Sequence, residues 1–431
     1  MKKIIVFSHN CFSETQNNGK TLSAIFGSIG KNRIAQLFIS TREMPSSDGV
    51  ADKYFLISDR DLVNSAIHHR PFGHEIVGTG SEAGIRNNSH SHKPLGKRNI
   101  ITIWLREIVW LILFRFKSKH LLSWIKEQDP GVLFYLSGDA IFSQSVTRYL
   151  ASELNLPILV YVTDDYLVYN KPRLTSPLKW LHHRFLSKSA RKLFNNSENV
   201  FVISERMKEV YDDKYQITST ILRNTVPFLP FSYNKAIRDG SVVTIGYYGS
   251  LALGRDEQLI SLANLLREID LPQEVKVILD VYTFSPTTSK TIRKFDESGI
   301  ILHNGLNQEK MKSSIKEHDI LLLVESDKRR YTNLTMLSFS TKITEYMIMS
   351  RPILAYGPSE IGSMYFITEN GCGVHVNSRS PSRDQILQVH NLISSSNFRE
   401  ELARKAYEVA IRKFDPEDQS DKFQTIINKH I

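Results

Sequence analysis

Cysteine is scarce in this chain of 431 residues, because Cys11 and Cys372 are the two that it contains. Cysteines so few and so far apart in sequence exclude a disulfide framework and argue against a structural zinc site. This usage is typical of proteins of the reducing cytosol, so we expect a cytoplasmic protein.

Long apolar runs are lacking as well. The chain starts with Lys2 and Lys3 and a short apolar stretch, which does not predict a signal peptide. The apolar segment 100–114 contains Arg106 and Glu107 and is too short for a membrane span. We therefore expect a protein that is soluble or attached to the surface of a membrane.

One glycine is missing from a segment that otherwise resembles a nucleotide-binding loop. The segment SETQNNGKT (13–21) ends in Gly-Lys-Thr, but Glu14 stands where the phosphate-binding loop of an NTPase needs its first glycine. This difference argues against an ATP-hydrolysing loop. What remains is a strand, a polar turn at 17–19 and a helix from Thr21, whose N-terminus favours anions.

Acidic residues are rare in two segments that hold the positive charge of the chain. Residues 93–119 contain seven Lys and Arg against Glu107, and residues 171–192 contain seven and no Asp or Glu. The whole chain has a formal net charge of +10, so the remainder is slightly acidic.

These two segments leave three interpretations open. They could be amphipathic helices with one buried and one solvated face, or surfaces for anionic membrane lipids, or surfaces for nucleic acid. The sequence has no helix-turn-helix, RRM or zinc-finger pattern, so we expect no nucleic acid. In the second segment the apolar residues fall on one helical face: Leu178, Leu181, Phe185, Ala190 and Leu193.

Short aliphatic runs alternate with helical patterns throughout the chain, which predicts an α/β protein with parallel sheets covered on both faces. The expected strands of the first half are 3–8, 33–39, 132–136, 158–162 and 199–203, and its expected helices are 21–29, 103–127, 140–154, 177–194 and 206–211. Residues 68–98 lack periodicity and are expected to form a long loop.

A second α/β unit is expected to begin near residue 241. The strand 242–250 runs into a glycine turn and a helix at 256–268, and the expected strands that follow are 275–281, 300–303, 320–324 and 352–356. We expect domains at 1–226 and 241–408 around the proline-containing linker 227–240, with residues 409–431 forming a C-terminal helix that returns to the first domain. Each domain is expected to be a Rossmann-like doubly wound sheet, with ligands beyond the carboxyl ends of the strands in a cleft between the domains.

The segment SFSTKITEYMIMSRPILAYGPSE (338–360) carries the strongest chemical signal. Ser340 or Thr341 is a plausible N-cap, and Lys342 in the first turn opposes the helix dipole unless an anion is bound there. Glu345 lies on the same helix face as Lys342. The group could hold a diphosphate and a ribose, or Lys342 and Glu345 could be an ordinary surface ion pair.

This segment, followed by ITENGCGV (367–374), resembles the donor domain of GT-B glycosyltransferases. It is closest to glycosyltransferase family 4 of bacterial surface-polysaccharide (O-antigen and capsule) clusters. Three further segments agree in order: VFVISERMKEVYDDKY (200–215), GYYGSLALGRDEQLISL (246–262) and HNGLNQEKMKSSIKEHDILLLV (303–324). The resemblance implies transfer of a sugar from a nucleotide-sugar donor, with retention of configuration and without a metal or other cofactor.

The resemblance also implies the donor-binding residues. Glu345 matches the ribose-binding glutamate, whereas Leu337 replaces the first glutamate of the E-x7-E pair. Gly249 matches the glycine of the first turn, Ser250 stands where the family often has Arg, and Arg255 matches a basic residue that contacts the diphosphate. The diphosphate would then lie against Ser340, Thr341, Lys342, Arg255 and backbone amides, with fixed cations in place of a divalent ion.

Two sites in the first domain complete the comparison. Gly19 and Lys20 match the glycine-containing first loop, which would approach the donor phosphate or sugar. Asp164 and Asp165 end a buried strand where the family carries a His-containing motif near the reacting sugar, so they are the candidate catalytic residues. The alternative for this pair is a solvated turn after a strand.

The sequence thus predicts a glycosyltransferase that extends a bacterial surface glycan, with a polyprenyl-diphosphate-linked glycan as acceptor. It would work at the inner face of the cytoplasmic membrane, held there by residues 93–119 and 171–192. A nucleotide-sugar epimerase on the same scaffold and a non-enzymatic module that binds anionic lipid or nucleic acid are the alternatives.

Overall fold

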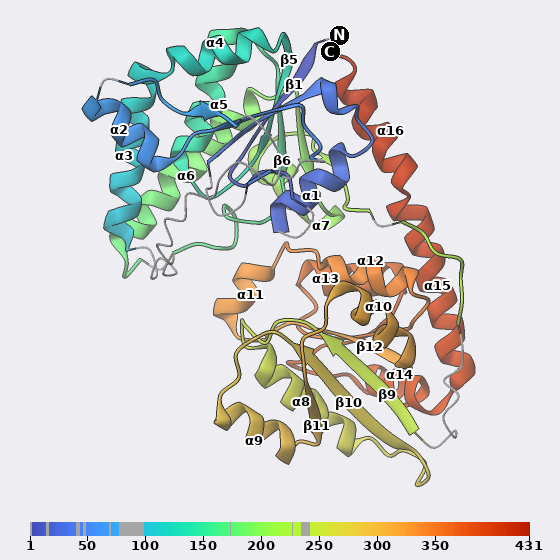
Figure 1. Cartoon of the computed structure of the whole chain (residues 1–431). Coiled ribbons are helices and arrows are strands. Elements are labelled where there is room, and N and C mark those ends of the chain that lie inside the picture. The colour runs from blue at the N-terminus through green and yellow to red at the C-terminus, as the bar shows by residue number, and fades with distance from the viewer. Residues whose placement is uncertain are drawn as a thin grey trace. The chain divides into compact units, whose positions relative to one another are not determined.

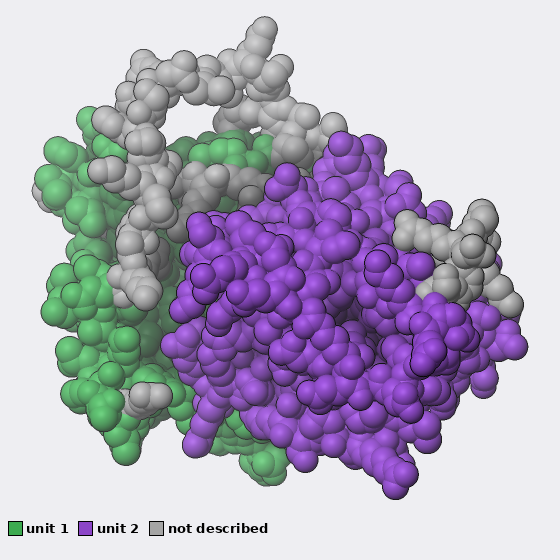
Figure 2. Space-filling model, turned by 90° about the horizontal axis from the view of Figure 1, so that it is seen from below, with its two compact units in different colours: residues 1–224, 419–431 green, residues 225–418 purple. Residues whose placement is uncertain are grey.

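The structure is a computed structural model that describes residues 2–13, 17–39, 44–45, 49–68, 70–76, 99–172, 174–225, 227–233 and 242–431. Most of the expected loop 68–98, the basic residues Lys93, Lys97, Arg98 and Arg173, and the second half of the expected linker lie outside these residues. The chain divides into two compact units, unit 1 (1–224 and 419–431) and unit 2 (225–418) (Figure 2).

Unit 1 is built on a sheet whose strands follow the order β4-β3-β2-β1-β5-β6-β7-β8 within the described residues. Its strands are β1 (Lys3–Ser8), β2 (Ile34–Phe38), β3 (Lys53–Leu56), β4 (His74–Glu75), β5 (Pro130–Leu136), β6 (Ile158–Val162), β7 (Asn199–Val202) and β8 (Thr220–Ile221). All neighbours are parallel except β3 and β4. The parallel sheet is confirmed, whereas β4 lies in the stretch expected to be a loop.

Helices α1 to α7 and most of α16 belong to unit 1 (Figure 1). Their bounds are α1 (Asn17–Phe26), α2 (Asp59–His68), α3 (Ile100–Lys117), α4 (Lys119–Glu127), α5 (Ile141–Leu154), α6 (Pro177–Asn195), α7 (Glu205–Tyr215) and α16 (Pro416–Ile427), with a 3-10 turn η1 (Lys31–Arg33). Two predictions are wrong here. Helix α1 begins at Asn17 rather than Thr21, and the helix expected at 103–127 is two helices that meet at Ser118.

The break at Ser118 has a local cause. Its hydroxyl lies 3.3 Å from the Arg115 carbonyl oxygen, to which it donates, and 3.0 Å from the Tyr149 hydroxyl. A serine hydroxyl that bonds a carbonyl of the preceding turn competes with the helical backbone hydrogen bond. Helix α3 therefore ends at Lys117, and α4 starts in a new direction.

The core of unit 1 is completed by the C-terminal helix. Phe423 of α16 lies with its ring centroid 5.0 Å from that of Phe26 and 5.7 Å from those of Phe134 and Phe201. Phe423 and Ile427 are both buried. Residues from opposite ends of the sequence thus share one apolar cluster.

Unit 2 is a sheet of parallel strands in the order β11-β10-β9-β12-β13-β14. Its strands are β9 (Val242–Tyr248), β10 (Lys276–Thr283), β11 (Ile300–Asn304), β12 (Ile320–Val324), β13 (Ile353–Tyr356) and β14 (Val374–Val376). Its helices are α8 (Arg255–Glu268), α9 (Ser289–Glu297), α10 (Gln308–Glu317), α11 (Arg329–Thr335), α12 (Thr341–Ile348), α13 (Gly362–Asn370), α14 (Arg383–Ser394) and α15 (Ser396–Phe414).

The side chains of β12 show how helices on both faces stabilise this sheet. Leu322 and Val324 pack in the cluster that contains residues of α8, α9 and α14. Leu321 and Leu323 alternate with them and pack in the cluster that contains residues of α10, α12, α13 and α15 (Figure 1). The strand order reverses between β9 and β12, which makes the carboxyl ends of these two strands the expected ligand site.

Candidate functional site

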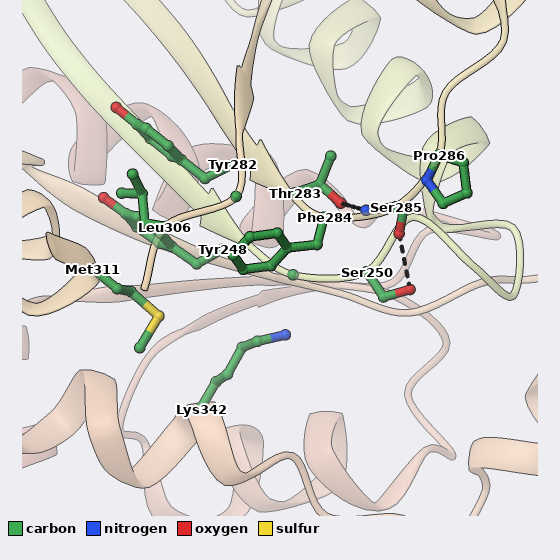
Figure 3. A pocket seen from close by; sticks show the side chains of 12 residues that line it. Tyr248, Ser250, Tyr282, Thr283, Phe284, Ser285, Pro286, Leu306, Met311 and Lys342 are labelled. Carbon is green, nitrogen blue, oxygen red and sulfur yellow. Dashed lines mark hydrogen bonds between the residues drawn. The ribbon is translucent and has the colours of Figure 1, made fainter. Parts of the chain in front are cut away.

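A pocket of about 500 Å³ lies in unit 2 at the carboxyl ends of β9, β10 and β11 (Figure 3). Its lining includes Tyr248 at the end of β9, Gly249 and Ser250 after it, Phe284 and Ser285 after β10, Leu306 after β11, and Lys342 from α12. This volume is in the range of small-molecule sites, and the position agrees with the general rule for open parallel sheets.

One side of the pocket is aromatic. The rings of Tyr248 and Tyr282 are stacked with centroids 4.9 Å apart, and Tyr282 stacks in turn on His303 at 4.4 Å. Phe284 is 79% exposed and its ring stands beside this stack (Figure 3). Flat apolar surfaces of this kind suit a planar heterocycle such as a nucleobase.

The opposite side is cationic, because Lys342 rises from α12 toward the turn after β9 (Figure 3). A Cβ atom at position 249 would lie 2.5 Å from Lys342 Nζ, so the absence of a side chain at Gly249 gives the amine its place. The amine also lies 5.7 Å from the ring centroid of Tyr247. The phenol of Tyr247 donates to the carbonyl oxygen of Ser250 at 2.7 Å, which fixes the same turn.

Burial, and after it the charge of the nearby Arg255, lowers the pKa of Lys342 to about 8. No ion pair of Lys342 is found among the described residues. A cation that is half-buried beside another cation favours an anionic ligand, because the ligand would offset both the burial and the repulsion.

Arg255 itself is held by a carboxylate. Its Nη2 atom donates to both oxygens of Glu325 at 3.0 Å, and its Nε atom donates to the Val324 carbonyl oxygen at 3.2 Å. Glu325 follows β12 directly and is buried. Glu325 is not among the residues predicted from the sequence, because its partner Arg255 is 70 residues away.

Ser250, which stands where the resembling family often has an arginine, takes part in the hydrogen bonding of the turn after β9. Its hydroxyl accepts from the Ala252 amide at 3.1 Å and lies 3.2 Å from the Ser285 hydroxyl. Ser285 in turn accepts from the Leu251 amide at 2.9 Å. Ser250 therefore shapes the turn after β9 and links it to the turn after β10.

Helix α12 starts beside this pocket with uncapped amides. Ser340 occupies the N-cap position, but its side chain makes no capping hydrogen bond. Its backbone amide donates to the Ser363 hydroxyl at 3.0 Å, and Thr341 is exposed. Glu345 is half-buried one turn further on and contributes to the electrostatic environment of Lys342. Leu337 is fully buried, so its side chain is part of the core.

In unit 1, Gly19 and Lys20 lie in the first turn of α1. A Cβ at position 19 would lie 2.5 Å from the Cys11 carbonyl oxygen and 2.7 Å from Ser13 Cβ. Gly19 thus lets α1 pack against the loop that follows β1. Lys20 is exposed on the same helix.

Asp164 and Asp165 follow β6 but have different surroundings. The carboxylate of Asp165 is buried and accepts from the amides of residues 167, 168 and 169 at 2.7–3.0 Å and from the Tyr211 hydroxyl at 3.1 Å. The interpretation of a solvated turn is therefore wrong for Asp165, which organises the loop. Asp164 is half-buried and accepts from the Tyr166 hydroxyl at 3.2 Å. Burial and the charge of Asp165 raise the pKa of Asp164.

A second pocket, of about 240 Å³, adjoins this loop and is lined by Tyr166, Asp139, Arg106, Glu107 and His182 among others. The buried carboxylate of Glu107 accepts from the Ile141 and Phe142 amides at 2.9 and 2.7 Å, so it caps α5. His182 Nε2 lies 3.1 Å from the same carboxylate. No local pattern predicts this group, because Glu107 and Arg106 stand together in an otherwise apolar segment.

No group of three or more His, Cys, Asp or Glu side chains in the described part of the chain is arranged to hold a metal ion. Of the residues predicted in unit 2, Gly249, Ser250, Arg255 and Lys342 lie together, with α12 beginning beside them. Gly19, Lys20, Asp164 and Asp165 belong to unit 1.

No family model matches the chain, and no curated protein matches its sequence. Solved structures do match over nearly its whole length. HepE from Anabaena in complex with UDP is 11% identical, with 99% of this chain and 100% of that chain covered and a TM-score of 0.60. The trehalose-6-phosphate synthase OtsA is 10% identical over the full length of both chains, with a TM-score of 0.61. WaaG, a glycosyltransferase involved in lipopolysaccharide biosynthesis, is 13% identical over 97% and 99% of the chains, with a TM-score of 0.56.

Proposed function

We propose that this chain, which has the GT-B fold of these glycosyltransferases, transfers a sugar from a nucleotide-sugar donor to a growing bacterial surface glycan. The acceptor would be polyprenyl-diphosphate-linked, the anomeric configuration would be retained, and no metal ion would be needed. The observation that carries the proposal is the half-buried Lys342 beside Gly249 and Arg255, next to a pocket of about 500 Å³ with an aromatic wall.

The donor would lie along the carboxyl ends of β9 and β10. Its base would occupy the pocket beside Phe284, and Glu345 would accept hydrogen bonds from the ribose hydroxyls. The diphosphate would lie between Lys342, the amides of the turn at 249–251 and the first amides of α12. These fixed donors stabilise the negative charge that develops on the departing nucleotide diphosphate, which is the part of the reaction that a metal ion serves elsewhere.

The acceptor would bind to unit 1. Asp164, whose partner Tyr166 lines the 240 Å³ pocket, would orient the acceptor hydroxyl. Asp165 would act as a positioning residue by holding the loop that carries both side chains. Its carboxylate already has four hydrogen bonds from that loop and from Tyr211.

Thermal unfolding against UDP, GDP, ADP and their sugar conjugates, without metal, tests the donor site. A nucleotide at 100 times its dissociation constant stabilises the folded state by about 2.7 kcal/mol. We expect one nucleoside diphosphate to raise the Tm of the wild type and not that of Lys342→Met. If no nucleotide raises the Tm with or without Mg²⁺, the proposed donor site is wrong; a Tm rise only with Mg²⁺ would overturn the metal-free part.

Product analysis separates a transferase from an epimerase. An epimerase converts the nucleotide sugar without an acceptor, whereas a transferase releases the nucleoside diphosphate only as the glycan grows. NMR of the product anomer then decides between retention and inversion.

We also propose that unit 1 attaches to an anionic membrane surface through α3 and α6. The two helices lie side by side, because the Trp104 ring packs on His182 and Phe185 with centroids 5.5 and 6.0 Å away. Their outward residues are apolar and exposed: Ile101, Leu105, Ile108, Ile112, Phe116, Leu178, Leu181 and Phe185. The interpretation of 171–192 as an amphipathic helix with one buried face is therefore wrong for its first half. Of the apolar residues named for that face, only Ala190 and Leu193 are buried.

The charge around this apolar face favours anionic lipid. Exposed basic side chains on and beside the two helices include Arg115, Lys119, Lys179, Arg184 and Lys188. No helix of the described residues is long and apolar enough to cross a bilayer. An apolar face with basic flanks is the pattern of surface attachment.

Vesicle sedimentation tests this surface. Phosphatidylglycerol vesicles should bind the wild type more strongly than phosphatidylcholine vesicles, and Ile112→Glu should weaken the binding. Leu387→Glu in unit 2 is the matched control, because Leu387 is 56% exposed and Ile112 53%. Equal loss in both variants would count against a specific membrane face.

A further inference from the structure

A third pocket, of about 560 Å³, lies between α3 and α5 of unit 1 and has no part in the proposed reaction. Trp110, Leu111 and Phe114 of α3 and Val146 of α5 give it an apolar wall. Arg115 and Arg148 line it as well, with the hydroxyl-bearing Ser145 and Ser152. A pocket of this size with a few convergent polar groups is a typical ligand site.

The two arginines have no ion pair among the described residues. The Nη2 atom of Arg148 donates to the hydroxyls of Ser145 at 3.3 Å and Ser189 at 3.4 Å. Its Nε atom is buried and has no hydrogen-bond partner in the described part of the chain. Burial of a guanidinium nitrogen without an acceptor is costly, so a ligand oxygen that accepts a hydrogen bond from Arg148 would be favourable.

Arg115 adds a second positive charge from the neighbouring helix. Its guanidinium carbon lies 5.9 Å from the ring centroid of Tyr149, whose hydroxyl lies 3.0 Å from that of Ser118. Burial, and after it the charge of Arg115, lowers the pKa of Arg148, which indicates that the two cations repel one another. The acidic residue of the lining is Glu153, which is exposed.

We infer that this pocket binds the phosphate group of a phosphate ester. Two guanidinium groups present planar sets of donors that match a phosphate oxyanion, and the negative charge of a bound phosphate would offset their repulsion. The apolar wall beside them would take the group to which the phosphate is esterified. The inference does not depend on the proposed transferase activity, since none of the residues assigned to that reaction lines this pocket.

The phosphate could belong to a membrane lipid or to a soluble phosphorylated molecule. Leu111 lines the pocket and is itself 41% exposed on α3, so the pocket opens beside the apolar face described above. Calorimetric titration with inorganic phosphate and with glycerol 3-phosphate measures the site in solution. Sedimentation with phosphatidylglycerol and phosphatidylcholine vesicles measures the lipid source.

The variants are Arg115→Gln, Arg148→Lys and, as control, Lys188→Gln, which removes an exposed charge on α6 that does not line the pocket. We expect glycerol 3-phosphate affinity to fall about tenfold in Arg115→Gln and Arg148→Lys, as for loss of a charge-assisted hydrogen bond, and less than twofold in the control. Wild-type Tm values in the variants exclude a folding defect.

The outcomes separate the two sources. If Arg115→Gln also weakens vesicle binding more than Lys188→Gln does, the phosphate is that of a lipid headgroup. If vesicle binding falls equally in Arg115→Gln and Lys188→Gln, but glycerol 3-phosphate binding falls only in the pocket variants, the ligand is a soluble molecule. If Arg115→Gln and Lys188→Gln have equal effects in both measurements, the pocket does not bind phosphate and the inference is wrong.

Discussion

Gly249 and Lys342 are 93 residues apart in sequence, yet a single methyl group at position 249 would lie 2.5 Å from the lysine amine. This fit gives the first prediction. Gly249→Ala should push the amine out of the donor-side pocket and weaken nucleotide binding at least tenfold. The Tm should fall modestly as well, because the added Cβ would also lie 2.9 Å from the hydroxyl of the buried Tyr247. Gly138→Ala is the control, since an added Cβ there meets no atom within 4 Å. Unchanged nucleotide affinity in Gly249→Ala would mean that the amine does not contact the ligand.

The lowered pKa of Lys342 predicts how nucleotide binding depends on pH. With a pKa of about 8 the free protein loses this charge above pH 8, whereas a bound diphosphate would restore the proton. Affinity should therefore fall by up to about tenfold per pH unit above pH 8, with uptake of a proton on binding. Calorimetry at pH 9 in two buffers of different ionisation enthalpy measures the uptake. Lys342→Arg keeps its charge at this pH and should abolish the effect; a persisting effect would assign it to another group.

The ion pair between Arg255 and Glu325 predicts a recoverable loss of stability. Arg255→Met leaves a buried carboxylate without its partner and should cost roughly 3–5 kcal/mol in the free energy of unfolding. The double variant Arg255→Met/Glu325→Leu should regain most of that stability. If Arg255 also contacts the diphosphate, nucleotide binding should stay weak in the double variant. Full recovery of binding would restrict Arg255 to a structural role.

Substitutions of Asp164 and Asp165 should have different effects on stability and on kcat. Asp165→Ala removes the acceptor of three amides and a hydroxyl, and we expect a loss of at least about 2 kcal/mol in unfolding free energy. Asp164→Asn should leave the Tm near that of the wild type and lower kcat. Because the pKa of Asp164 is raised, the wild-type rate should fall on acidification at a higher pH than an ordinary aspartate would give. A destabilised Asp164→Asn with normal kcat would contradict this division of roles.

Phe423 should be among the most sensitive positions of unit 1. Phe423→Ala opens a cavity beside Phe26, Phe134 and Phe201 and should cost about 3–5 kcal/mol in denaturant unfolding. Phe284→Ala is the matched control, because Phe284 is 79% exposed. Similar losses in the two variants would show that α16 adds little to the core.

The sequence predicts the elements that the sheet requires. Residues 158–162 and 320–324 are β-rich aliphatic runs, and both form strands with these bounds, because a central parallel strand needs apolar side chains on both faces. The start of α1 at Asn17 was missed because a glycine in the first turn reads as a loop residue. Its cause, the close approach of the 11–13 loop to Gly19, is a tertiary contact that no local pattern contains.

The site is predictable to a smaller extent. Lys342 stands out because a lysine in the first turn of a helix is unfavourable without an anion. Glu325 does not stand out, because its partner Arg255 is 70 residues away in the sequence. The two side chains meet because β9, which precedes Arg255, and β12, which precedes Glu325, are neighbours in the sheet. In the same way Asp164 and Asp165 look equivalent in sequence, and only the loop that folds back over Asp165 distinguishes them.

The position of α16 has a consequence for how the chain is made. The core of unit 1 contains Phe423 and Ile427, while all of unit 2 is encoded between residues 225 and 418. Domains generally fold in the order in which they leave the ribosome. Here unit 2 can be complete while the earlier-synthesised unit still exposes the apolar surface around Phe26 and Phe134. Until residues 419–431 emerge from the ribosome, that surface is open to chaperones and to aggregation. Translation of these residues therefore determines when the apolar surface of unit 1 can be buried.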